Sequence, residues 1–239
     1  MIPLRDNIPR VHTPVAVWCI LVANVLAFLY ESGLDPAGLF EFTHLYGVVP
    51  ARFFHPDWAL SMGFPPGGYS SLVTHMFLHG GWMHLIMNMW TMWVFADNIE
   101  DVMGPARFVA FYLVCGFAAL GLHMVFNADS TMPVIGASGA IAGVMGAYFL
   151  LYPHAKVLTL IPIIIIPYFI ELPAVLFLGI WFLIQVWSGM TTLGDSQGGG
   201  VAWWAHIGGF AAGMLLLPLF RRNERCHYCH GRRSEDWPG

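Results

Sequence analysis

Long apolar runs separated by short polar segments are the dominant pattern along the chain. Six runs have roughly 17–20 residues, enough for a helix to cross a hydrocarbon layer of ~30 Å. The pattern therefore predicts an all-α membrane protein, a polytopic bundle of six transmembrane helices. The predicted spans are residues 14–30, 78–96, 108–126, 134–152, 172–190 and 203–220.

Two segments outside these spans are also apolar. Residues 32–77, between the first and second span, carry scattered aromatic residues, prolines and glycines. We expect a long outer loop there that is partly embedded in the outer leaflet. Residues 157–170 run into the fifth span, but Pro162 and Pro167 interrupt any helix. We expect this second segment to lie in or near the cytoplasmic interface.

Composition and charge support a membrane domain. The chain has 239 residues, of which 57% are hydrophobic and 10% charged, with a mean hydropathy of +0.65. A soluble domain needs more charge on its surface, and ten basic residues do not make a nucleic-acid surface.

The basic residues also give an orientation. Of the ten Lys and Arg residues, only Arg52 falls on the side opposite the termini. The positive-inside rule then places both termini in the cytoplasm. We predict a cytoplasmic segment at residues 1–13, a membrane domain at 14–220, and a basic cytoplasmic tail at 221–239.

Four polar residues fall inside predicted spans, namely His84, Asn88, Ser138 and His206. Polar groups in hydrocarbon are costly, so they are functional candidates by default. Ser138 and His206 lie at similar depths below the outer ends of the fourth and sixth spans. His84 and Asn88 are four residues apart and share one face of the second span.

Small residues at a spacing of four let two helix backbones approach closely. Such stripes occur on the fourth and sixth spans, and their packing would bring Ser138 and His206 within reach of each other. The stripes consist of Gly139, Gly143 and Ala147 on the fourth span and Ala205, Gly209 and Gly213 on the sixth.

These side chains have the chemistry of a serine hydrolase. A neutral imidazole at His206 can take the proton from the Ser138 hydroxyl. The Asn88 amide, the His84 ring and the Ser138 backbone N–H can stabilise an oxyanion. Glu171 lies at the cytoplasmic end of the fifth span, so no carboxylate completes a triad and we predict a Ser–His dyad.

Three short motifs carry a resemblance to a known family. They are HLIMN at 84–88, GASG at 136–139 and AHIGG at 205–209. In this order and in these helices they resemble the rhomboid family of intramembrane serine proteases, in its basic six-helix bacterial-type form. The resemblance implies Ser138 as nucleophile, His206 as base, and Asn88 and His84 in the oxyanion hole.

The resemblance further implies substrates that are transmembrane helices, entering laterally from the lipid bilayer and cut near the outer face. It implies no metal or cofactor, and we expect a bacterial inner membrane. Some family members carry a tyrosine one turn after the nucleophile, against which the histidine ring packs. Here that position is Ala142, so any ring stacking must come from elsewhere.

Other interpretations remain open at this stage. Singly, Ser138 can be a small packing residue, and His84 and His206 structural histidines. A non-catalytic rhomboid-like protein that binds transmembrane clients is the alternative function. A transporter lacks the expected paired charges, and a metal site at His75, His79 and His84 lacks a completing carboxylate or thiolate.

The tail carries a Cys-x-x-Cys-His motif formed by Cys226, Cys229 and His230. This spacing occurs in haem attachment and as half of a zinc site. Haem attachment of this kind takes place outside the cytoplasm, where the tail is not expected. We expect a flexible tail with reduced thiols, with zinc shared between two chains as the alternative.

Overall fold

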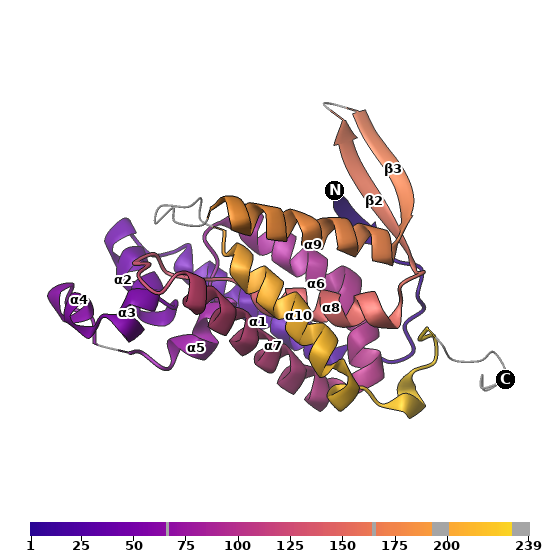
Figure 1. The fold of residues 1–239 in the computed structure, drawn as a ribbon, viewed down its shortest axis with the longest axis horizontal. Coiled ribbons are helices and arrows are strands. Elements are labelled where there is room, and N and C mark those ends of the chain that lie inside the picture. Colours follow the sequence, from indigo (N-terminus) through magenta and orange to yellow (C-terminus); the bar gives the residue numbers. More distant parts are fainter. Residues whose placement is uncertain (66, 164–165, 193–200, 231–239) are drawn as a thin grey trace.

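The computed structural model describes residues 1–65, 67–163, 166–192 and 201–230. Six long helices lie side by side and form most of the molecule (Figure 1). Each overlaps one of the predicted spans, and the apolar core lies between them. They are α1 (Val15–Glu31), α6 (Trp82–Met103), α7 (Pro105–Phe126), α8 (Ser138–Leu151), α9 (Ala174–Thr191) and α10 (Trp203–Phe220).

A helical membrane protein fits the lengths and hydropathy of these helices. Among the helices that the structure describes, α7, α9 and α10 are long and apolar enough to cross a membrane. The helices α1 and α8 are apolar but shorter. The count of six spans stays a prediction.

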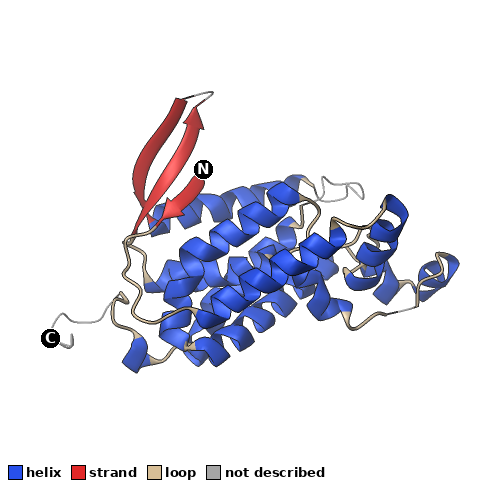
Figure 2. Ribbon diagram, turned by 180° about the vertical axis from the view of Figure 1, so that it is seen from behind, coloured by secondary structure: helices blue, strands red, loops and turns tan. Residues whose placement is uncertain are grey.

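The prediction of an all-α fold is confirmed only in part: the described residues are mostly helical, but the apolar segment before α9 forms strands. The strands β1 (Ile2–Arg5), β2 (Lys156–Ile163) and β3 (Ile166–Pro173) make an antiparallel sheet in the order β1-β2-β3. The hairpin of β2 and β3 projects from the bundle beside the N-terminus (Figure 2). Prolines exclude a helix there, and the β-branched residues of β2 favour an extended chain.

The predicted outer loop folds into short helices at one end of the bundle (Figure 1). They are α2 (Pro36–Tyr46), α3 (Pro50–Phe54), α4 (Pro56–Ser61), α5 (Ser71–Thr74) and the 3-10 helix η1 (His75–Phe77). Arg52 is buried among them, and its guanidinium donates to the carbonyl oxygens of His44 (2.5 Å), Leu45 (3.2 Å) and Pro65 (3.1 Å). The one basic residue on the predicted outer side therefore holds the loop together.

The same loop fixes the chain that enters α8. Val48 and Val134 exchange backbone hydrogen bonds of 3.0 and 2.7 Å, and Gly136 N–H donates to the His75 carbonyl at 2.8 Å. Gly136 has a φ of +122°, which glycine adopts without the steric cost of a side chain. These bonds keep residues 134–137 out of the helix, so α8 begins at Ser138, four residues later than predicted.

The helices α8 and α10 are in backbone contact, as the small-residue stripes predicted. A Cβ atom on Gly209 would lie 2.0 Å from the carbonyl oxygen of Gly139. A Cβ atom on Gly213 would lie 1.9 Å from that of Gly143. No side chain fits at these positions, so the glycines set the distance between the two helices.

At the opposite end of the bundle, two acidic residues of α6 hold the N-terminal segment. Glu100 accepts hydrogen bonds from the backbone N–H groups of Ala16 (3.0 Å) and Val17 (2.8 Å). Asp101 accepts from those of Val11 (2.6 Å) and His12 (2.7 Å). Glu100 therefore satisfies N–H groups in the first turn of α1, which have no partners within that helix, and Asp101 holds the segment just before it.

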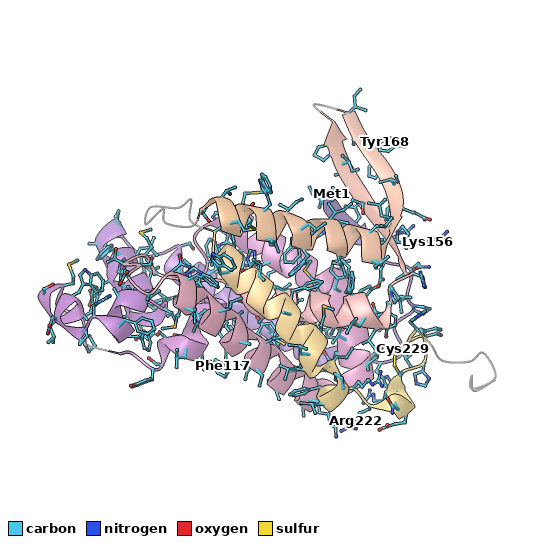
Figure 3. The ribbon with its side chains drawn as sticks, in the orientation of Figure 1. Met1, Phe117, Lys156, Tyr168, Arg222 and Cys229 are labelled. Atoms are coloured by element: carbon cyan, nitrogen blue, oxygen red, sulfur yellow. A yellow bond between two sulfur atoms is a disulfide. The ribbon has the colours of Figure 1, made fainter. Side chains whose placement is uncertain are left out.

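The expectation of a flexible, reduced tail is wrong for residues 221–230. Cys226 and Cys229 form a disulfide, and both are buried against the core. The His230 N–H donates to the Leu151 carbonyl at 2.7 Å, which ties the tail to the end of α8. Figure 3 shows Cys229 and Arg222 at the same end of the molecule as Lys156. Residues 231–239 of the predicted tail lie outside the described residues.

We expect Gly209→Ala to destabilise the bundle, because its methyl group would overlap the Gly139 carbonyl. Overpacking of this kind costs about 1–3 kcal/mol, or more when backbone must move. Thermal unfolding in detergent measures the effect. Gly179→Ala on α9 is the matched control, since its Cβ meets nothing within 4 Å. Equal melting temperatures for the two variants would contradict the packing argument.

A second prediction concerns Asp6, which accepts a hydrogen bond from the Tyr148 hydroxyl. Burial raises the pKa of Asp6 from 3.8 to about 6. Because the folded pKa is the higher one, the protonated form favours the fold at low pH, and this contribution is lost as pH rises through about 6.

We therefore expect backbone amides of β1 to be protected from hydrogen exchange roughly tenfold more at about pH 5 than at about pH 8, after correction for intrinsic rates. Asp6→Asn removes this titrating group and should make the protection depend clearly less on pH. A wild-type protection factor that does not change with pH would contradict the assignment.

Candidate active site

The structure brings Ser138 and His206 together, as the sequence predicted. The Ser138 Oγ lies 2.9 Å from the His206 Nε2, within hydrogen-bonding distance. Ser138 is the first residue of α8, and His206 is in the first turn of α10. The close glycine contacts between the two helices hold these two side chains near each other.

The second ring nitrogen of His206 also has a partner, which the sequence analysis missed. Its Nδ1 lies 2.8 Å from the Oε1 of Gln185 on α9. Gln185 is a buried polar residue in an apolar helix. Like His84, Asn88, Ser138 and His206, it is a polar residue inside a predicted span. It is an amide, whereas the third residue of a serine-protease triad is expected to be a carboxylate.

Aromatic rings from two helices pack around the His206 imidazole. The Trp181 ring of α9 lies 5.8 Å away at an interplanar angle of 33°, and the Trp203 ring lies 6.2 Å away at 88°. Ala142, one turn after Ser138, is fully buried and has no ring to offer. The aromatic contact therefore comes from α9 and from the start of α10.

His84 and Asn88 converge on the backbone just before the serine. A Cβ atom on Gly136 would lie 2.7 Å from the His84 Nε2 and 3.5 Å from the Asn88 Nδ2. The Asn88 Nδ2 is buried and has no hydrogen-bond partner among the described residues. The Gly80 N–H points at the His84 Nδ1 at 3.3 Å, so Nδ1 accepts and Nε2 carries the proton. Two N–H donors thus face the same small space.

His75 and His79, the other two histidines of the possible metal site, have contacts of their own. The His75 Nδ1 lies 2.9 Å from the Ser71 carbonyl oxygen, and the His79 ring packs against that of His84 at 5.1 Å. Across the described residues, no three His, Cys, Asp or Glu side chains are grouped to hold a metal ion. The structure therefore gives no support to a metal at His75, His79 and His84, or at Cys226, Cys229 and His230.

The sequence matches a known protein family. The family described as Rhomboid domain matches residues 66–223, more than half of the chain, and this range includes His84, Asn88, Ser138, Gln185 and His206. Over 76 residues, 32% of the chain, the sequence is 41% identical to RHOMBOID-like protein 6, mitochondrial, of Arabidopsis thaliana.

Two relatives from Bacillus subtilis carry protease in their names. The chain is 34% identical to the putative rhomboid protease YdcA over 89 residues, 37% of the chain. It is 38% identical to the rhomboid protease GluP over 81 residues, 34% of the chain. The matches take up 24% of the plant protein, 44% of YdcA and 15% of GluP, so the chain spans less than half the length of each.

Proposed function

The chain belongs to the rhomboid family, and from this premise we propose that it is an intramembrane serine endopeptidase. It would cleave transmembrane-helix substrates near the outer membrane face. Relatives include proteins named proteases and proteins named only rhomboid-like, so membership alone does not assign proteolysis. The observation that carries the proposal is the 2.9 Å contact between Ser138 Oγ and His206 Nε2.

The reaction would begin when His206 accepts the hydroxyl proton of Ser138. The Ser138 oxygen then attacks the carbonyl carbon of the scissile bond, and His206 returns the proton to the leaving amine. Water hydrolyses the resulting ester in a second step that uses the same base. A distance of 2.9 Å supports direct proton transfer between the two groups.

The negative oxygen of the tetrahedral intermediate needs preorganised donors. We assign this role to the Asn88 amide, the His84 Nε2–H and the Ser138 backbone N–H. Ser138 is the first residue of α8, and N–H groups of a first turn have no acceptor within their own helix. The unpartnered, buried Nδ2 of Asn88 supports the assignment, since such a group is costly unless an acceptor arrives.

The proposed membrane arrangement has six spans and both termini in the cytoplasm. Residues 1–13 precede the protease domain of residues 14–220, and residues 221–239 follow it. In this orientation the outer loop and the Ser138 end of α8 face the outer side. A substrate helix must unwind locally there, because helical carbonyl groups are hydrogen-bonded and shielded.

The family and the apolar helices make this an integral membrane protein. We expected a bacterial inner membrane. The relatives do not support that choice, because they include proteins named as mitochondrial from plant, yeast and fish as well as bacterial ones.

A non-catalytic protein that binds transmembrane clients is the second candidate function. It would use the same bundle but would not need a serine and a histidine in contact. Ser138, His206 and the donors that face Gly136 are all present here, and this favours the enzyme.

We expect Ser138→Ala to abolish cleavage of a reporter transmembrane helix while the melting temperature stays within a few degrees of wild type. The loss should reach at least about 1,000-fold, because the nucleophile is removed. A fluorophosphonate probe should label the wild type and leave the variant unlabelled. Equal cleavage by the two proteins would end the proposal and favour client binding.

The oxyanion assignment is tested with Gly136→Ala, whose methyl group would overlap the His84 Nε2 and would require a side chain at a φ of +122°. We expect cleavage to fall about 100-fold, the usual effect of losing one oxyanion donor. Asn88→Ala should give a loss of similar size. Gly121→Ala, whose Cβ meets nothing within 4 Å, should retain full activity. Full activity in Asn88→Ala would exclude that side chain from the oxyanion hole.

A further inference from the structure

We propose that Gln185 is a positioning residue that holds His206 in the tautomer required of a base. This inference deepens the proposed function and rests on the roles given there to Ser138 and His206. The hydrogen bonds of the Gln185 side chain go to His206 and Trp181, while Ser138 bonds the opposite nitrogen of the His206 ring. Gln185 would act through the second nitrogen of the imidazole, the place that a carboxylate takes in serine-protease triads.

The geometry of the contact is the first support. The Gln185 Oε1 and the His206 Nδ1 are 2.8 Å apart, and Gln185 is 4% exposed. A hydrogen bond shielded from water is stronger and more directional than an exposed one. The contact joins α9 to α10. The opposite nitrogen of the same ring, His206 Nε2, lies 2.9 Å from the Ser138 Oγ.

The second support is the orientation of the amide. The Gln185 Nε2 donates to the Trp181 carbonyl one turn earlier in α9, at 3.0 Å. Turning the amide over would place its oxygen against that carbonyl oxygen and leave two acceptors in contact. The oxygen therefore faces His206, and an oxygen can only accept a hydrogen bond. The proton must sit on Nδ1, which leaves the lone pair of Nε2 directed at the Ser138 hydroxyl.

The third support is the ring packing. Trp181 provides both the carbonyl that orients the Gln185 amide and an aromatic face 5.8 Å from the imidazole. One turn of α9 thus fixes the ring plane and its protonated nitrogen. A histidine held only by packing against Ala142 would lack both restraints.

The Gln185 amide orients the His206 ring but carries no charge. Among the described residues, the titratable groups that lie close enough to influence His206 are His84 on α6 and His123 on α7. Neither is a carboxylate, so neither of them offsets the imidazolium that forms during proton transfer. An acidic side chain at position 185 would keep the acceptor and add that charge, and this difference can be measured.

The test compares Gln185→Leu, Gln185→Glu and wild type in the full chain, with kcat and KM measured on a transmembrane reporter across a range of pH. We expect Gln185→Leu to lower kcat about 100-fold with KM unchanged within about twofold. Gln185→Glu should recover most of kcat and move the acid limb of the pH profile up by about one pH unit or more. Leu183→Ala, at a 66% exposed position on the same helix, is the matched control.

A merely structural role would not produce that pattern. If Gln185→Leu keeps the wild-type kcat, the proposal is wrong. It is also wrong if Gln185→Glu is as impaired as Gln185→Leu and its pH profile does not move. Should Gln185→Leu fail to fold, Gln185→Asn replaces it, since the shorter amide cannot reach the ring.

A readout that does not need activity separates this proposal from the proposed function. In protein labelled with ¹⁵N-histidine, the NMR shifts of His206 report which ring nitrogen carries the proton. We expect the Nδ1–H form to dominate in wild type and in Ser138→Ala, and the two forms to mix in Gln185→Leu. Absence of cleavage together with a fixed Nδ1–H tautomer would overturn the enzyme but not the contact. A mixed tautomer in wild type would overturn the role of Gln185.

Discussion

The backbone contact between α8 and α10 is the constraint on which the site depends. Gly209 and Gly213 approach the carbonyl oxygens of Gly139 and Gly143 so closely that no side chain fits. A serine hydroxyl and an imidazole are short groups, so they reach 2.9 Å only when their helices are this near. In a membrane, where apolar burial does not draw helices together, such close packing supplies the attraction itself.

Polar contacts at the two ends of the bundle fix where its helices start. At one end, the Val48–Val134 pairing and the bond from Gly136 to His75 set Ser138 as the first residue of α8. At the other end, Glu100 and Asp101 hold the start of α1. Both of these buried carboxyl groups are matched to backbone N–H groups, which offsets their desolvation. The glycine contact sets the separation of the helices, and these contacts set their register.

The sequence predicted those parts of the fold and the site that one local pattern decides. The apolar runs predicted where the six long helices lie but not all of their ends, since α6 and α8 begin four residues later than predicted. The glycine spacing predicted that α8 and α10 bring Ser138 and His206 together. The hairpin of β2 and β3 was not predicted, because a continuous apolar run is compatible with either a strand or a helix. The roles of Glu100, Asp101 and Gln185 depend on partners far away in the sequence. The pairing of Cys226 with Cys229 accompanies the burial of both residues, and the charged sequence of the tail does not predict that burial.

The choice of an amide at position 185 has a physical reason within the proposed reaction. A carboxylate beside His206 would have to be buried in an apolar bundle, where an unpaired charge costs several kcal/mol. An amide orients the ring at a far smaller cost but leaves the imidazolium without a counter-charge. Among the described groups that act on His206 none is negative, so the oxyanion of the proposed intermediate would supply the negative charge next to it. In the proposed reaction, the charges of the transition state would then balance between the imidazolium and the oxyanion. Stabilising that oxyanion would depend on the donors proposed for it, Asn88 and His84.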